Sequence, residues 1–102
     1  MSYRVVFAPE ARDDLRNLYD FIADRASGQR ALTYIEGLER FCLSFRDFPE
    51  RGIPRDDLFP GLRVVGYRRR VALAFHVDGQ TVVFDRVLYG GRDLRLAFGS
   101  AD

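Results

Sequence analysis

The side chains best suited to chemistry in this sequence are its arginines. All 16 basic residues are arginine and none is lysine, so chemistry that needs a lysine ammonium group is excluded. Residues 1–60 contain nine arginines and eleven acids, a net charge of −2, whereas residues 61–102 contain seven arginines and four acids, a net charge of +3. A guanidinium group holds carboxylate or phosphate through paired hydrogen bonds and stays charged at physiological pH. The candidate arginines of the basic part are Arg63, Arg68, Arg69, Arg70, Arg86, Arg92 and Arg95.

Three uses of these arginines are open from their spacing alone. They could clamp RNA phosphates and stabilise the charge that develops on phosphorus during cleavage. They could instead anchor an acidic protein partner through a few buried contacts. The third use is solvation, because runs of charge usually lie on solvated faces.

Other reactive groups are scarce. The chain has one histidine, His76, and one cysteine, Cys42, which excludes a histidine–cysteine metal site, a pair of histidines and an internal disulfide. We predict that His76 is a half-exposed strand residue and that Cys42 is buried as a small core residue. We expect no metal and no cofactor. A solvated helix face is the interpretation we favour for the carboxylates Asp13, Asp14, Asp20, Asp24, Glu36 and Glu39.

The elements that must position these groups follow from the period of the apolar residues. Pro9 marks the start of a helix, Ser27-Gly28 breaks it, and a second helix runs from near Gln29 to before Pro49. Strands are expected at residues 3–7, 62–67, 71–77 and 81–88. The order predicts an α+β fold, in which an antiparallel two-helix hairpin covers one sheet that includes a three-stranded antiparallel meander. Residues 47–61 are expected to form a loop.

Length and composition predict one globular domain over residues 1–102. The lone thiol fits a reducing cytosol, and no apolar run has the length of a signal peptide or a membrane span. We therefore expect a cytoplasmic protein that does not contact membranes. The net charge of +1 predicts no direct DNA binding by the chain alone.

Four segments, taken in order, resemble the RelE/ParE toxin superfamily. They are Phe7–Leu15, Tyr34–Leu38, Phe59–Val64 and Val83–Asp93. The Pro60-Gly61-Leu62-Arg63 segment and the ending from Arg86 to Asp93 are most similar to the ParE branch. The resemblance implies the toxin of a type II toxin–antitoxin pair, neutralised by an antitoxin that covers the helical hairpin and part of the sheet.

The resemblance also implies one of two activities. ParE-like toxins poison DNA gyrase, and RelE-like relatives cut messenger RNA in the ribosomal A site. The nuclease residues implied here are Arg63, Arg70, Arg86 and Arg92. Phe98 stands where the nucleases have a tyrosine, however, and a phenyl ring has no hydroxyl for proton transfer. We therefore favour a non-enzymatic gyrase inhibitor with a ParD-like antitoxin; a RelE-like endoribonuclease and a toxin fold that has lost its toxicity are the alternatives.

Two binding surfaces are expected. Apolar residues are crowded around the first helix more widely than one core-facing stripe needs, and an acidic antitoxin segment would contact nearby arginines. The predicted antitoxin site comprises Leu18, Tyr19, Phe21, Ile22, Arg63, Arg70 and Arg86. The predicted target site comprises Arg92, Arg95 and Phe98.

Overall fold

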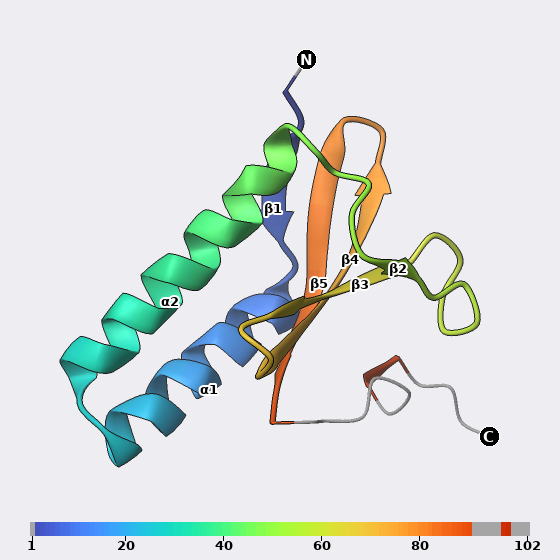
Figure 1. Cartoon of the computed structure of the whole chain (residues 1–102). Helices are drawn as coiled ribbons and strands as arrows, with labels where there is room; N and C mark the ends of the chain where they lie inside the picture. Colours follow the sequence, from blue (N-terminus) through green and yellow to red (C-terminus); the bar gives the residue numbers. More distant parts are fainter. Residues whose placement is uncertain (1, 91–96, 99–102) are drawn as a thin grey trace.

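The computed structural model describes residues 2–90, 97 and 98. Two helices pack against one face of a five-stranded sheet, which confirms the predicted α+β class (Figure 1). The elements are β1 (Arg4–Phe7), α1 (Pro9–Arg25), α2 (Gly28–Leu43), the 3₁₀ helix η1 (Ser44–Arg46), β2 (Ile53–Pro54), β3 (Arg63–Tyr67), β4 (Val71–Asp78) and β5 (Thr81–Tyr89). The segment expected to be a loop therefore contains one additional short strand, β2.

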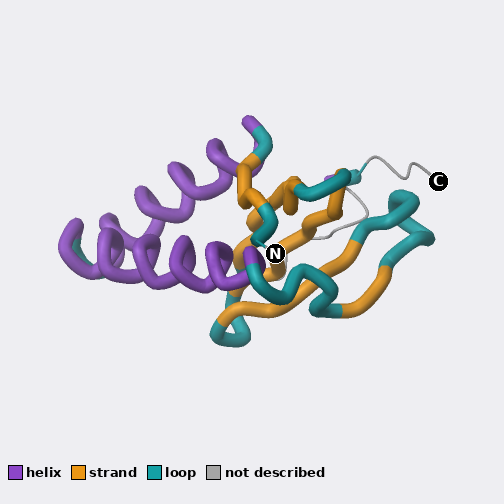
Figure 2. The backbone as a smooth tube through the Cα atoms, turned by 90° about the horizontal axis from the view of Figure 1, so that it is seen from above, coloured by secondary structure: helices purple, strands orange, loops and turns teal. Residues whose placement is uncertain are grey.

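The two helices begin where the sequence supplies a suitable first turn. Pro9 opens α1, at a position where its missing N–H has no partner to lose. The backbone N–H of Arg30 donates to the Ser27 hydroxyl at 3.1 Å, so Ser27 caps the start of α2. The short break between the helices folds them into an antiparallel pair that lies in one layer beside the sheet (Figure 2).

The strand order of the sheet is β1-β5-β4-β3-β2. β1 is parallel to β5, and the other neighbouring strands are antiparallel. β1 pairs only with residues 81–84 of β5, so among the described residues no strand pairs with the second half of β5 on that side. Helix α1 takes its place there, since the Val87 N–H donates to the Asp14 carboxylate of α1 at 2.8 Å.

A β-bulge interrupts β5 at Asp85. Phe84 pairs with Phe75 and Arg86 pairs with Ala74, so Asp85 is an extra residue without a partner in the register. Such a bulge redirects the side chains on either side of it. It thereby sets the orientation of both Asp85 and Arg86.

The core lies between the helices and the sheet. The Phe45 ring packs edge-on against the rings of Phe75 and Phe84, with centroids 5.0 and 5.2 Å away. Leu38 and Cys42 of α2 are completely buried beside them, as predicted for Cys42. In the part of the chain that the structure describes, neither helix has the length and apolar composition to cross a membrane.

Candidate functional site

Asp14 is buried and paired, which corrects the expectation of a solvated carboxylate. Its side chain is 5% exposed and accepts hydrogen bonds from Arg86 Nε and Nη2 at 2.8 and 3.0 Å, in addition to the bond from the Val87 N–H. The sequence contained a signal for this position. Asp14 lies three residues after Ala11 and four before Leu18, so it shares their core-facing stripe.

The carboxylate of Asp14 holds the Arg86 guanidinium in place. The hydrogen bonds to Asp14 raise the pKa of Arg86 above its usual value, so the guanidinium stays charged at physiological pH. The Arg86 side chain is still 24% exposed. The Asp14–Arg86 pair therefore acts as a clamp that joins α1 to β5. Only part of the Arg86 side chain remains accessible to a partner protein.

The other two arginines of the predicted antitoxin site lie at different ends of β3. Arg63 Nε donates to the Arg51 backbone carbonyl at 2.8 Å, which ties the start of β3 to the segment before it. The Arg51 guanidinium in turn lies over the Phe45 ring, 4.1 Å from its centroid. Arg70 is exposed in the turn after β3. The structure therefore does not bring Arg63, Arg70 and Arg86 together into one cluster.

The apolar residues predicted for the antitoxin site divide between core and surface. Leu18 is 4% exposed and belongs to the core. Phe21 is half-buried, with its ring 4.9 Å from that of Tyr89 and the Arg25 guanidinium 3.7 Å from its centroid. Tyr19 is exposed and Ile22 half-buried. A pocket of about 290 Å³ between α1 and the end of β5 is lined by Asp14, Asn17, Leu18, Phe21, Val87, Tyr89 and Gly90.

A second hollow, of about 440 Å³, lies between α2 and the turn from β3 to β4. Its lining residues are Ile22, Gln29, Arg30, Thr33, Tyr34, Gly37, Arg40, Tyr67 and Arg68. The sequence analysis missed this site, although Arg30, Tyr34, Gly37 and Arg40 follow one another at helical spacing. The Tyr34 hydroxyl is buried without a hydrogen-bond partner among the described residues, and burial raises its pKa.

His76 and Asp85 form a pair across β4 and β5. His76 Nδ1 lies 2.6 Å from Asp85 Oδ2, and the Phe59 ring meets the imidazole edge-on at 6.0 Å. His76 is half-buried, as predicted. Burial raises the pKa of Asp85, and the hydrogen bond with His76 opposes that rise. Among the residues that the structure describes, no three side chains of the metal-binding types lie together.

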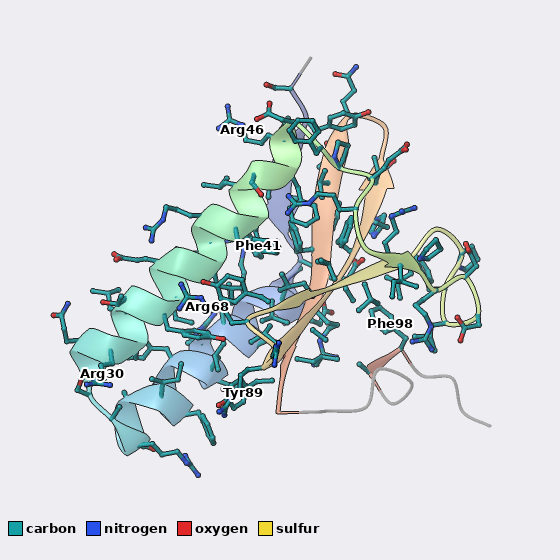
Figure 3. The ribbon with its side chains drawn as sticks, viewed as in Figure 1. Arg30, Phe41, Arg46, Arg68, Tyr89 and Phe98 are labelled. Atoms are coloured by element: carbon teal, nitrogen blue, oxygen red, sulfur yellow. The ribbon has the colours of Figure 1, made fainter. Side chains whose placement is uncertain are left out.

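The predicted target site is only partly described. Arg92 and Arg95 lie outside the described residues. Phe98 is half-buried and lies on the side of the sheet away from the helices (Figure 3).

Known structures of toxin–antitoxin systems share this arrangement of a helical hairpin on a sheet. A chain of the chromosomal ParDE TA system from P. aeruginosa matches with a TM-score of 0.75 and 19% identity, over 86% of this chain and 96% of that chain. A chain of the toxin–antitoxin complex RelBE2 from Mycobacterium tuberculosis matches with a TM-score of 0.64 and 24% identity, over 90% of this chain and 95% of that chain. No curated protein sequence matches significantly. The fold is therefore one found in toxin–antitoxin systems.

The sequence itself narrows this class to one family. The model of the family described as ParE toxin of type II toxin-antitoxin system, parDE, matches residues 5–94. The chain therefore belongs to the ParE toxin family, which confirms the resemblance of the four segments.

Proposed function

We propose that this ParE-family toxin inhibits DNA gyrase by binding and not by catalysis, and that a ParD-like antitoxin neutralises it. The family match over residues 5–94 is the observation that carries this proposal. Two of the four arginines that a nuclease would use, and the residue in place of its tyrosine, support it further. Arg86 is held by Asp14 and Arg63 by a backbone carbonyl, and Phe98 has no hydroxyl group. With gyrase as the target, the toxin acts in the cytoplasm.

A supercoiling assay with purified gyrase tests this proposal. The toxin is expected to reduce supercoiling and to accumulate cleaved DNA–gyrase complexes, and toxin mixed beforehand with its antitoxin is the matched control. Unchanged supercoiling without cleaved complexes would rule out gyrase as the target.

The His76–Asp85 pair favours one alternative, a ribosome-dependent endoribonuclease. Because Asp85 bonds Nδ1, the imidazole is oriented with Nε2 available for proton transfer. Primer extension on messenger RNA with toxin-treated ribosomes would then show new 5′ ends, which His76→Ala would abolish. Intact messenger RNA with the wild-type toxin would exclude this activity.

The antitoxin is proposed to cover the outer part of α1 and the neighbouring turn. Tyr19, Phe21, Ile22 and Arg70 have exposed surface there, whereas Leu18 supports this surface from the core. Arg63 and Arg86 are proposed to contribute with the surface that their internal hydrogen bonds leave exposed. In a pull-down, Tyr19→Ala combined with Arg70→Glu is expected to weaken antitoxin binding. Leu32→Ala with Arg46→Glu, on the exposed side of α2 and in η1, is the control, and equal binding by both double variants would contradict this site.

A further inference from the structure

Three arginines line the hollow between α2 and the turn from β3 to β4, which we call the arginine cleft, and two more arginines follow in the turn. Arg30, Arg40 and Arg68 line it, and Arg69 and Arg70 follow Arg68 in the exposed turn. Within the described part of the chain, none of the five forms an ion pair with a carboxylate, in contrast to Arg16, Arg55 and Arg86. The net charge of +1 thus conceals a local concentration of arginines that have no ion-pair partner among the described residues.

The turn that carries three of these arginines is conformationally unfavourable for them. The Arg70 N–H donates to the Tyr67 carbonyl at 3.2 Å, and the two residues between them, Arg68 and Arg69, have φ values of 51° and 62°. Asn and Gly are the residues that such turns favour, because left-handed backbone is unfavourable for residues with a long side chain. The β4–β5 hairpin has Gly79 at φ 62°. The fold therefore does not account for arginine at these two positions, and backbone strain of this kind gathers at functional sites.

The shape of the cleft fits an extended ligand. Arg30 and Arg40 lie ten residues apart on α2, which is about 15 Å along the helix axis, and Arg68 approaches from the opposite wall. In Figure 3, Arg30 is near the start of α2 and Arg68 lies alongside the helix. A single small anion would reach one of these groups, whereas a chain of anions could reach several.

The lining of the cleft includes two aromatic residues, of which Tyr34 is half-buried and Tyr67 is 8% exposed. The rings of Tyr34 and Tyr67 meet edge-on with centroids 5.7 Å apart, and the buried Tyr34 hydroxyl has no hydrogen-bond partner among the described residues. Arg68 lies over the Tyr67 ring at 5.4 Å. Aromatic side chains beside a row of guanidinium groups are typical of sites that bind single-stranded nucleic acid.

We propose that the arginine cleft binds a nucleic-acid strand, with phosphates on Arg30, Arg40 and the turn arginines and a base beside the Tyr34 side chain. An acidic peptide is the weaker candidate, because Arg68, Arg69 and Arg70 are consecutive and exposed, which suits a run of regularly spaced phosphates. This proposal differs from the prediction that the chain alone does not bind DNA, which rested on its net charge of +1. Binding to phosphates depends on the charges near the contact and not on the net charge of the protein. The proposal does not depend on the identity of the toxin's target.

The experiment is a fluorescence-anisotropy titration of the full chain with a labelled single-stranded DNA of about 12 nucleotides, over a range of salt concentrations. The test variant is Arg68→Asn with Arg69→Gly, which gives the turn the residues it favours and is expected to raise the melting temperature. Each phosphate contact contributes about 0.7 to the magnitude of the slope of log affinity against log salt concentration. One contact therefore strengthens binding about fivefold at 0.1 M salt relative to 1 M salt. Loss of two contacts should therefore reduce the slope by about 1.4 and weaken binding about 25-fold at 0.1 M salt.

The matched control is Arg4→Gln with Arg46→Gln, which removes the same charge away from the cleft; Arg46 lies at the opposite end of α2 from Arg30 (Figure 3). Unchanged affinity of this control supports the proposal. Parallel titrations with duplex DNA and with RNA identify which nucleic acid binds most tightly.

Three results would overturn the proposal: no binding at low salt, the same affinity for the turn variant and the wild type, or an equal loss in the control variant. Competition by an oligoglutamate peptide at concentrations as low as those of unlabelled DNA would also overturn it and assign the cleft to a protein partner. Gyrase inhibition is measured separately. A turn variant that loses DNA binding but still inhibits gyrase leaves the two proposals independent.

Discussion

Removing either partner of the Asp14–Arg86 ion pair is expected to destabilise the fold far more than removing a surface charge. The Asp14 side chain is 5% exposed and accepts three hydrogen bonds, two from Arg86 and one from the Val87 N–H. These bonds join α1 to the part of β5 that β1 does not reach. The Asp14–Arg86 pair therefore holds α1 against the second half of β5, beyond the residues that pair with β1.

The magnitude follows from what each substitution leaves behind. Arg86→Met leaves the Asp14 carboxylate buried with the Val87 N–H alone, and loss of one partner of a buried pair costs about 3–5 kcal/mol. We expect about 3 kcal/mol, because Arg86 is 24% exposed and water can replace part of the interaction. Asp14→Leu leaves an arginine that can turn toward solvent, so its cost is about 2 kcal/mol. The double variant removes both charges, so it should cost about 2 kcal/mol less than the sum of the two single variants.

Denaturant unfolding measures these differences as shifts of the midpoint at constant m-value. In a domain of this size, 3 kcal/mol corresponds to a fall in melting temperature of roughly 12 °C or more. The control is Arg16→Met, because Arg16 pairs with Asp13 on the same helix at 3.4 Å, with both side chains 70% exposed. It should cost less than about 0.5 kcal/mol. Single-variant costs below about 1 kcal/mol, or costs that simply add, would refute the clamp.

Three further predictions concern the core and the open face of the sheet. Gly37→Ala should lower the free energy of unfolding by roughly 1–3 kcal/mol, because the new Cβ would lie 2.8 Å from the Tyr67 hydroxyl. Adding Tyr67→Phe removes that hydroxyl and should restore stability in urea unfolding. A double variant as unstable as Gly37→Ala would contradict this contact. Burial raises the pKa of Cys42 to about 12, so its thiol should react slowly with Ellman's reagent at pH 8 when folded and quickly when unfolded; fast labelling of the folded protein would be inconsistent. Because burial raises the pKa of Asp85 and His76 opposes this, ionisation of Asp85 in His76→Ala should cost stability. The stability gap to the wild type should widen as the pH rises from acid through values above 3.8, where Asp85 loses its proton; a gap that stays constant over this range would refute the role of this carboxylate.

Most of the fold was predictable because its elements are long and periodic. The stripe from Ala11 to Ile22, the cap at Ser27 and the turn at Asp78-Gly79 each fix an element through local physics. β2 was not predictable in this way. It consists of Ile53 and Pro54 alone, and two residues are too few to show a strand pattern in the sequence. They form a strand because they pair with β3.

The site was less predictable because its contacts join distant parts of the chain. Asp14 and Arg86 are 72 residues apart, and the bulge at Asp85 that orients Arg86 has no local sequence signal. The prediction grouped the arginines of the expected three-stranded meander and the residues after it. It therefore placed Arg63 and Arg86 in one binding surface and overlooked Arg30 and Arg40, which only the packing of α2 beside the β3–β4 turn brings to Arg68.

Toxicity measurements on arginine variants must therefore be combined with measurements of stability. Arg86→Ala is expected to lower toxicity through lost stability whether or not Arg86 contacts a partner, because it removes the partner of a buried carboxylate. The turn variant with Arg68→Asn and Arg69→Gly is expected to be more stable than the wild type, because it relieves the left-handed backbone strain. It also removes two exposed positive charges. A loss of toxicity in a variant that unfolds at a higher temperature cannot come from the fold. A variant that loses toxicity but gains stability therefore shows that the substituted arginine contacts a partner. In the described part of the chain, the exposed turn with Arg68 and Arg69 is where such a variant can be made.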